Sequence, residues 1–167
     1  MISALPDTPP ETSPEPGQPV QPVVPAGFEK EVAIAALHRY WLWSDVMQRR
    51  FFELLPREEA VPGASSIEEA NRKTTGSILY GSYWLASLYI VVEGWRELHL
   101  EDPAIDALLE NETMVSLLRR HRNGVFHFQR NFGDRRIFDL FEAESRDWEV
   151  RIHAELGEAL GRILRAI

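Results

Sequence analysis

The stretch Leu118–Gln129, LRRHRNGVFHFQ, contains the side chains best suited to chemistry. Arg122, Asn123 and His127 stand at its centre. A neutral imidazole can take the proton of an RNA 2′-hydroxyl, and an imidazolium can protonate a leaving oxygen. A guanidinium can bind a phosphate through two hydrogen bonds and stabilise charge added in the transition state. These residue types predict phosphodiester cleavage without a metal, with Asn123 orienting either the phosphate or the histidine.

The spacing of Arg122 and His127 requires a break in the backbone. On a continuous helix five positions correspond to roughly 500°, so the two side chains would point about 140° apart. Gly124 lies between them, and glycine often ends helices because it adopts a positive φ easily. We therefore expect a helix that stops at Gly124, with His127 returning from the loop. Acid and base roles need two groups, so a symmetric dimer would supply a second Arg–His pair.

Further cationic or titratable side chains surround the central three. A nucleic-acid backbone could bind this set, which we predict to be the RNA phosphate site: Arg119, Arg120, His121 and Arg130. The alternative is a helix end that complements its own dipole and forms ion pairs with acidic neighbours, with His121 as an exposed helix-end cation. The aromatic residues Phe126, Phe128 and Phe132 could stack on unpaired bases or close the core under a loop.

Helical patterning predicts the scaffold that must position these residues. Apolar residues recur at helical spacing in residues 28–55, about 66–100 and 135–167. Asp102 with Pro103 predicts the start of a short helix, and Asn111 caps another. No strand pattern is present in the sequence. We predict an all-α, up-down antiparallel bundle of four to five helices.

One helical segment is unusually apolar. No charged residue occurs between Thr74 and Val92, which is long enough to suggest a membrane span. Gly, Ser, Thr and Tyr are interleaved throughout, and no basic flank marks a cytoplasmic end. A helix buried on most sides of a bundle explains the pattern better, so we expect no membrane association.

The first 26 residues differ from the rest. They are rich in proline, contain three acidic residues and no Lys or Arg, and lack the pattern of a signal peptide. We predict a disordered acidic tail over 1–26 and one helical domain over 27–167. The tail either solubilises the protein or presents a polyproline II ligand to a partner.

Composition excludes several classes of protein. The formal charge of −8 and pI near 5.2 argue against non-specific coating of DNA. The absence of cysteine excludes disulfides, thiolate metal sites and thiol nucleophiles, and it fits a cytoplasmic protein. We find no metal-ligand spacing and no glycine-rich phosphate loop, so we expect no metal and no cofactor. Arg146 and His153 repeat the Arg/His spacing, but we interpret them as a solvated helix face.

The segment RNGVFH, residues 122–127, resembles the Arg-x4–6-His motif of the HEPN superfamily in its Arg-Asn-x3-His form. An all-α bundle with this motif between two late helices is also similar to HEPN domains, over residues 28–167. Some HEPN toxins carry a tyrosine two positions after the histidine, where this chain has Gln129.

The resemblance implies a metal-independent endoribonuclease of a toxin–antitoxin or other defence system. It implies a homodimer with RNA as substrate, an antitoxin or other protein partner, and Arg122, Asn123 and His127 as catalytic residues. HEPN domains without ribonuclease activity also exist. The alternative is therefore a catalytically inactive module that binds a nucleotide or a protein.

Overall fold

The computed structural model describes residues 27–55, 67–131, 133–143 and 145–167. The predicted tail over 1–26 and the aromatic residue Phe132 lie outside this part of the chain. The described residues form helices only, which confirms the predicted all-α bundle. In chain order they are α1 Glu29–Leu54, α2 Ile67–Glu97, α3 Pro103–Leu109, α4 Glu112–Phe126, α5 Arg135–Glu142 and α6 Arg146–Ala166.

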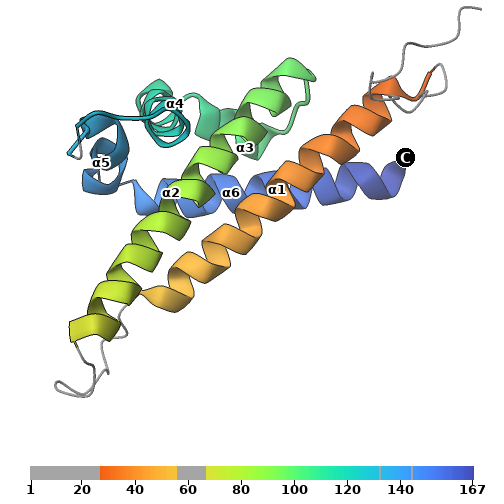
Figure 1. Cartoon of the computed structure of the whole chain (residues 1–167). Helices are drawn as coiled ribbons and strands as arrows, with labels where there is room; N and C mark the ends of the chain where they lie inside the picture. The colour runs from red at the N-terminus through yellow and green to blue at the C-terminus, as the bar shows by residue number, and fades with distance from the viewer. Residues whose placement is uncertain (1–26, 56–66, 132, 144) are drawn as a thin grey trace, which may run out of the picture.

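The two longest helices form the frame of the molecule. Figure 1 shows α1 and α2 side by side and antiparallel, with α6 crossing behind both, α4 and α5 on the other side of α2, and α3 behind the upper part of α2. In the buried contact between α1 and α2, the Ser44 hydroxyl donates to the Trp84 carbonyl at 3.2 Å. Helix α2 therefore lies between α1 and the helices that carry the motif.

All six helices contribute to one apolar cluster. Its largest buried side chains are Trp84 and Trp95 of α2. By length and composition, the segment Lys73–Glu97 of α2 could also cross a membrane, and half of its most apolar window is buried inside the protein. That burial agrees with the prediction of a core helix, although Leu79 and Tyr83 remain 49% and 41% exposed.

Two predicted helix starts are confirmed at the level of side chains. Asp102 Oδ1 accepts from the N–H groups of Ala104 and Ile105 at 3.0 and 3.4 Å, and Pro103 takes the first helical position of α3. Asn111 Oδ1 accepts from the Met114 N–H at 3.2 Å and caps α4.

The predicted last helix, residues 135–167, is in fact two helices, α5 and α6. The chain leaves α5 through an extended Ala143. The buried Ser145 hydroxyl bonds to the Leu140 carbonyl at 2.9 Å and to Glu149 Oε1 at 2.8 Å. A serine that bonds locally in this way offers the backbone an alternative to the helical ladder, which explains the break.

The prediction that α4 stops at Gly124 is wrong. The helix continues to Phe126, and Gly124 has an ordinary helical backbone with no positive φ. Gly124 is buried against α5, where an added Cβ would lie 3.0 Å from Ile137 Cγ1 and 3.2 Å from the carbonyl carbon of Arg136. The glycine therefore permits close packing of α4 on α5 and does not end the helix.

Replacing Gly124 with alanine should destabilise the protein by about 1–3 kcal/mol, because one of the crowded atoms belongs to the backbone and cannot rotate away. Urea unfolding followed by circular dichroism would measure the change in the free energy of unfolding.

Gly161→Ala is the matched control. Gly161 lies inside α6, and its added Cβ would meet only the flexible Arg165 side chain, at 3.3 Å. Alanine should leave stability unchanged there or raise it by up to about 1 kcal/mol. Equal effects of the two substitutions would contradict the packing role of Gly124.

Candidate functional site

Arg122 lies in the last turns of α4, with its guanidinium held on several sides. Nη1 donates to Asn123 Oδ1 at 3.0 Å, and Nη2 donates to both carboxylate oxygens of Glu93 at 3.2 Å. The guanidinium carbon lies 5.1 Å from the centre of the Tyr89 ring. Only 25% of the Arg122 side chain is exposed, so the group is well positioned before any ligand binds.

Sequence reasoning missed Glu93 and Tyr89, which reach Arg122 from α2. They are four positions apart, so they share one face of that helix. The only signal in the sequence was that Glu93 is the carboxylate that ends the uncharged run 74–92. Its partner could not be identified without knowing that α4 packs on α2.

His127 is the residue at which α4 ends. Its backbone is extended, with φ −116° and ψ 135°, and its side chain is exposed. The Gln129 amide nitrogen folds back onto α4, where it donates to the His127 carbonyl and to the Gly124 carbonyl, the latter at 3.2 Å. Arg136 of α5 donates to the Gln129 amide oxygen. Gln129 therefore ties the end of α4 to α5 and fixes the backbone that presents His127.

The structure does not bring Arg122 and His127 together within one chain. Because α4 is helical through Phe126, the five positions from Arg122 to His127 follow the helical rotation, and the two side chains diverge by roughly 140°. The Arg122 guanidinium contacts Glu93, Asn123 and Tyr89, and the exposed imidazole lies beyond the helix end. The expected convergence at Gly124 fails because that glycine is a packing residue.

His121 was predicted to bind a phosphate, and the structure places it in the interior instead. Its side chain is fully buried, Nδ1 lies 2.9 Å from the Ile137 carbonyl, and the ring meets Phe141 edge-on. Burial lowers the pKa of His121, while the carbonyls of Ile137 and Ser82 act in the opposite direction. The residue joins α4 to α5 and α2, so it is neither an RNA contact nor an exposed helix-end cation.

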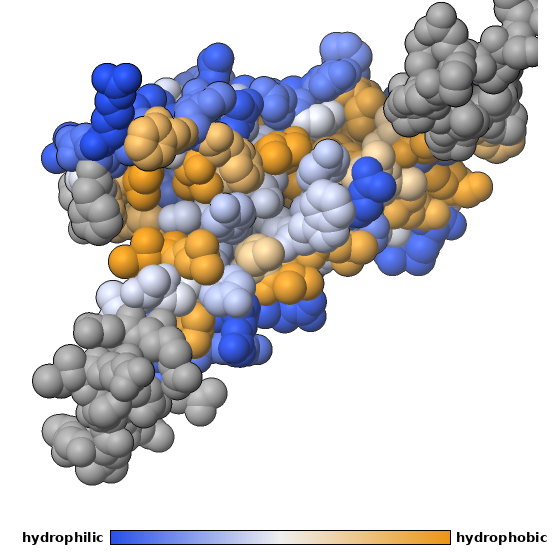
Figure 2. Space-filling model, in the orientation of Figure 1, coloured by the Kyte–Doolittle hydropathy of each residue, from blue (hydrophilic) through white to orange (hydrophobic). Residues whose placement is uncertain are grey.

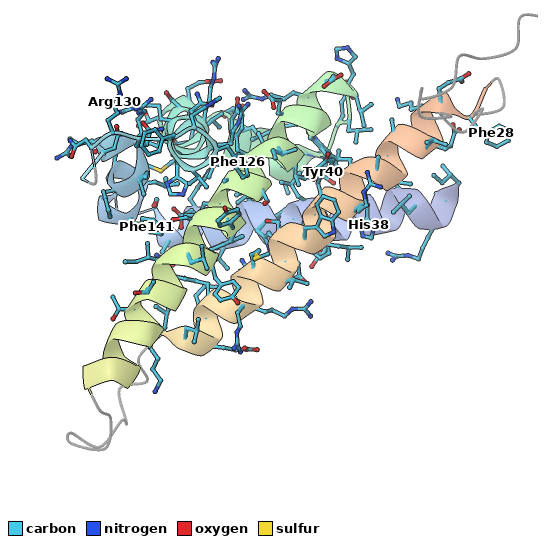
Figure 3. All side chains as sticks on the ribbon, in the orientation of Figure 1. Phe28, His38, Tyr40, Phe126, Arg130 and Phe141 are labelled. Carbon is cyan, nitrogen blue, oxygen red and sulfur yellow. The ribbon has the colours of Figure 1, made fainter. Side chains whose placement is uncertain are left out.

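The other predicted phosphate ligands are on the surface. Arg119, Arg120 and Arg130 are all exposed, and Figure 3 shows Arg130 at the outer edge of the α4–α5 end. Arg120 pairs with Asp139 at 2.9 Å. Among the described residues, neither Arg119 nor Arg130 has a carboxylate within ion-pair distance. These two side chains are therefore available to an anionic ligand.

The chain concentrates positive charge around the motif. Between residues 119 and 139 there are six arginines and two aspartates, a formal charge of +4 in a chain that totals −8. Arg136 donates to Asp134 at 2.9 Å, and these hydrogen bonds lower the pKa of Asp134 to about 2. Figure 2 shows hydrophilic residues gathered over α4 and α5 at the upper edge of the molecule. The positive charge of this segment is suited to binding a polyanion, although the chain as a whole is negatively charged.

The aromatic residues of the motif separate into two kinds. Phe126 is 45% exposed and meets Tyr83 of α2 edge-on, with ring centres 6.0 Å apart. Phe128 is 91% exposed. Phe126 thus packs between α2 and α4, which agrees with the alternative that these aromatic residues close the core. Phe128 is free to stack on a base.

The second Arg/His match, Arg146 and His153, is not a solvated helix face. His153 is 3% exposed and stacks on Trp41 with ring centres 5.3 Å apart. The Arg146 guanidinium lies over the Phe51 ring at 4.7 Å, and its Nε is 3.3 Å from the buried carboxylate of Glu149. This pair belongs to the packing of α6 against α1.

No model of a known protein family matches the chain, and neither a curated protein nor a solved structure is significantly similar to it. The comparisons therefore neither support nor oppose the HEPN resemblance.

The two neighbouring histidines should respond differently to removal. His121→Ala leaves a cavity at a fully buried position and should lower the free energy of unfolding by about 2–4 kcal/mol. His127→Ala changes an exposed side chain and should cost less than about 0.5 kcal/mol. Urea unfolding of both variants measures this, and a large loss of stability in His127→Ala would contradict the exposed position of that residue.

Burial also lowers the pKa of His153 to about 4, from about 6.5 in an unfolded chain. Between these pH values the unfolded chain binds a proton that the folded protein excludes. Stability should therefore fall as pH drops from 6.5 toward 4, by roughly 2–3 kcal/mol from this residue alone.

A comparison with His153→Gln isolates this contribution. Burial raises the pKa of Glu149 on the same helix, so Glu149 opposes the trend in both proteins. Unfolding free energies measured from pH 7 to pH 4 should fall less steeply in the variant. Parallel pH profiles would show that His153 is not the group responsible.

Proposed function

We propose that this protein is a metal-independent endoribonuclease of HEPN type that acts as a homodimer. Support comes from Arg122 and Asn123, joined by a 3.0 Å hydrogen bond on the helix that presents the exposed His127. The surrounding segment carries a formal charge of +4. A preorganised guanidinium, an accessible imidazole and local positive charge suit RNA cleavage without a metal.

In the proposed reaction an imidazole takes the proton of a ribose 2′-hydroxyl, and the 2′-oxygen attacks the adjacent phosphorus. Arg122 stabilises the charge on the phosphoryl oxygens. The bond from phosphorus to the 5′-oxygen breaks, and an imidazolium protonates that oxygen. The products are a 2′,3′-cyclic phosphate and a 5′-hydroxyl. Asn123 holds the guanidinium through its side-chain oxygen, which fits the role of a supporting residue.

A second copy supplies what one chain lacks. One protomer presents one exposed motif histidine, directed away from its own Arg122, whereas acid and base roles need two groups. An apolar surface suited to a second copy lies beside the motif, where Leu79, Tyr83 and Phe126 are each more than 40% exposed. A two-fold axis near this surface would set one protomer's Arg122 close to the other's His127.

We place this activity in a toxin or defence setting, because that is where the HEPN resemblance points, and in the cytoplasm, which fits the absence of cysteine. An antitoxin or another protein partner would then restrain the nuclease.

A second candidate function is a catalytically inactive HEPN-type module that binds a nucleotide or a protein. Glu93 favours it, because this carboxylate neutralises Arg122. A groove of about 260 Å³ between α1 and α2 opens beside Glu93 and is lined mainly by apolar residues, including Tyr40 and Ile90. An apolar groove next to a paired arginine is also the arrangement of a simple ligand site.

Cleavage of total RNA and transfer RNA in EDTA tests the proposal. Wild-type protein should release fragments ending in 2′,3′-cyclic phosphate. Arg122→Ala and His127→Ala should each lower the rate by roughly 100-fold or more. His127→Ala should also remove any toxicity of expression in a host cell.

Two substitutions control for general effects. Arg151→Ala removes an exposed arginine from α6, and His99→Asn replaces an exposed histidine whose φ of 49° asparagine tolerates. Both variants should cleave like the wild type. Equal cleavage by all variants indicates a contaminant, and no cleavage by an intact wild-type dimer favours the binding module.

A further inference from the structure

We propose that Glu93 gates Arg122: its carboxylate occupies the edge of the guanidinium that a phosphate needs, and an anion binds only when Glu93 turns away. This inference rests on the proposed function in that it assigns Arg122 to phosphate binding. It adds a residue of α2 that sets how readily the site accepts RNA.

Most N–H groups of Arg122 are either hydrogen-bonded or closed to a ligand. Both carboxylate oxygens of Glu93 lie 3.2 Å from Nη2, and Asn123 takes Nη1 at 3.0 Å. Nε is buried and has no hydrogen-bond partner, so solvent and ligands do not reach it. One face of the guanidinium lies over the Tyr89 ring. An anion that binds Arg122 with two hydrogen bonds must therefore compete with Glu93 for Nη2.

Glu93 is held loosely enough to be displaced. Its side chain is 49% exposed, and ion pairs at such exposure contribute little to stability. The carboxylate also has space to move, since Glu93 lines the groove of about 260 Å³ between α1 and α2. Rotation into that groove would free Nη2 while Asn123 and Tyr89 still hold the guanidinium in place.

Glu97 provides a matched control. It lies one helical turn further along α2, is exposed and lines the same groove. Among the described residues, no hydrogen bond or ion pair joins Glu97 to Arg122. Glu93→Gln and Glu97→Gln remove the same charge from the same surface and keep the side-chain size. Only the first should weaken the hold on Arg122, because glutamine keeps one acceptor oxygen but lacks the negative charge.

The test is binding of a 12-nucleotide 2′-O-methyl RNA, which cannot be cleaved through its 2′ position. Full-length wild type, Glu93→Gln, Glu97→Gln, Arg122→Ala and the Glu93→Gln/Arg122→Ala double variant are compared by fluorescence anisotropy over a salt series. Glu93→Gln should bind about three- to ten-fold more tightly than wild type. Glu97→Gln should stay within about two-fold of wild type, and Glu93→Gln should gain nothing when Arg122 is absent.

Three results would overturn the gate. Glu93→Gln could bind no more tightly than wild type, Glu97→Gln could match its gain, or the gain could persist without Arg122. The assay is independent of catalysis, so the gate and the nuclease can fail separately. Tighter binding by Glu93→Gln with no RNA cleavage would support the gate and reject the nuclease. Cleavage that depends on Arg122 without tighter binding would do the reverse.

Discussion

The candidate site depends on one interaction, in which Glu93 and Tyr89 of α2 hold the Arg122 guanidinium of α4. A guanidinium held in advance loses little freedom when a ligand binds, and that is the main advantage of a preorganised site. The ion pair with Glu93 also neutralises the positive charge of Arg122, to which a phosphate would otherwise bind. Under the proposed function, Arg122 is held in position to bind a phosphate, and one exposed carboxylate competes with that phosphate.

The helical bundle supports this contact because it packs α4 against two neighbouring helices. On one side α4 packs on α2, whose buried tryptophans Trp84 and Trp95 belong to the common core. On the other side α4 packs on α5, and Gly124 allows the two helices to approach closely. His121 bonds to the Ile137 carbonyl, and Gln129 links the end of α4 to α5. Contacts on two sides thus hold the end of α4 in place, and His127 is the exposed side chain at that end.

Local signals in the sequence predicted much of the fold. The helix starts predicted from Asp102, Pro103 and Asn111 were correct, because these residues act on backbone groups next to them in the sequence. Features that depend on tertiary contacts were misjudged: Gly124 has the sequence appearance of a helix end, and His121 stands among arginines yet lies in the core. The Glu93–Arg122 pair spans 29 positions, and nothing local indicates which carboxylate a partly buried arginine will meet.

The most direct measurement is RNA cleavage by mixed dimers of wild-type and His127→Ala chains, prepared by unfolding and refolding the two together at several ratios. If each site needs the histidines of both protomers, only dimers of two wild-type chains cleave. The rate should then follow the square of the wild-type fraction. A rate that falls in simple proportion to the wild-type fraction would show that one histidine is enough for each site, and it would contradict a site that uses the histidines of both protomers.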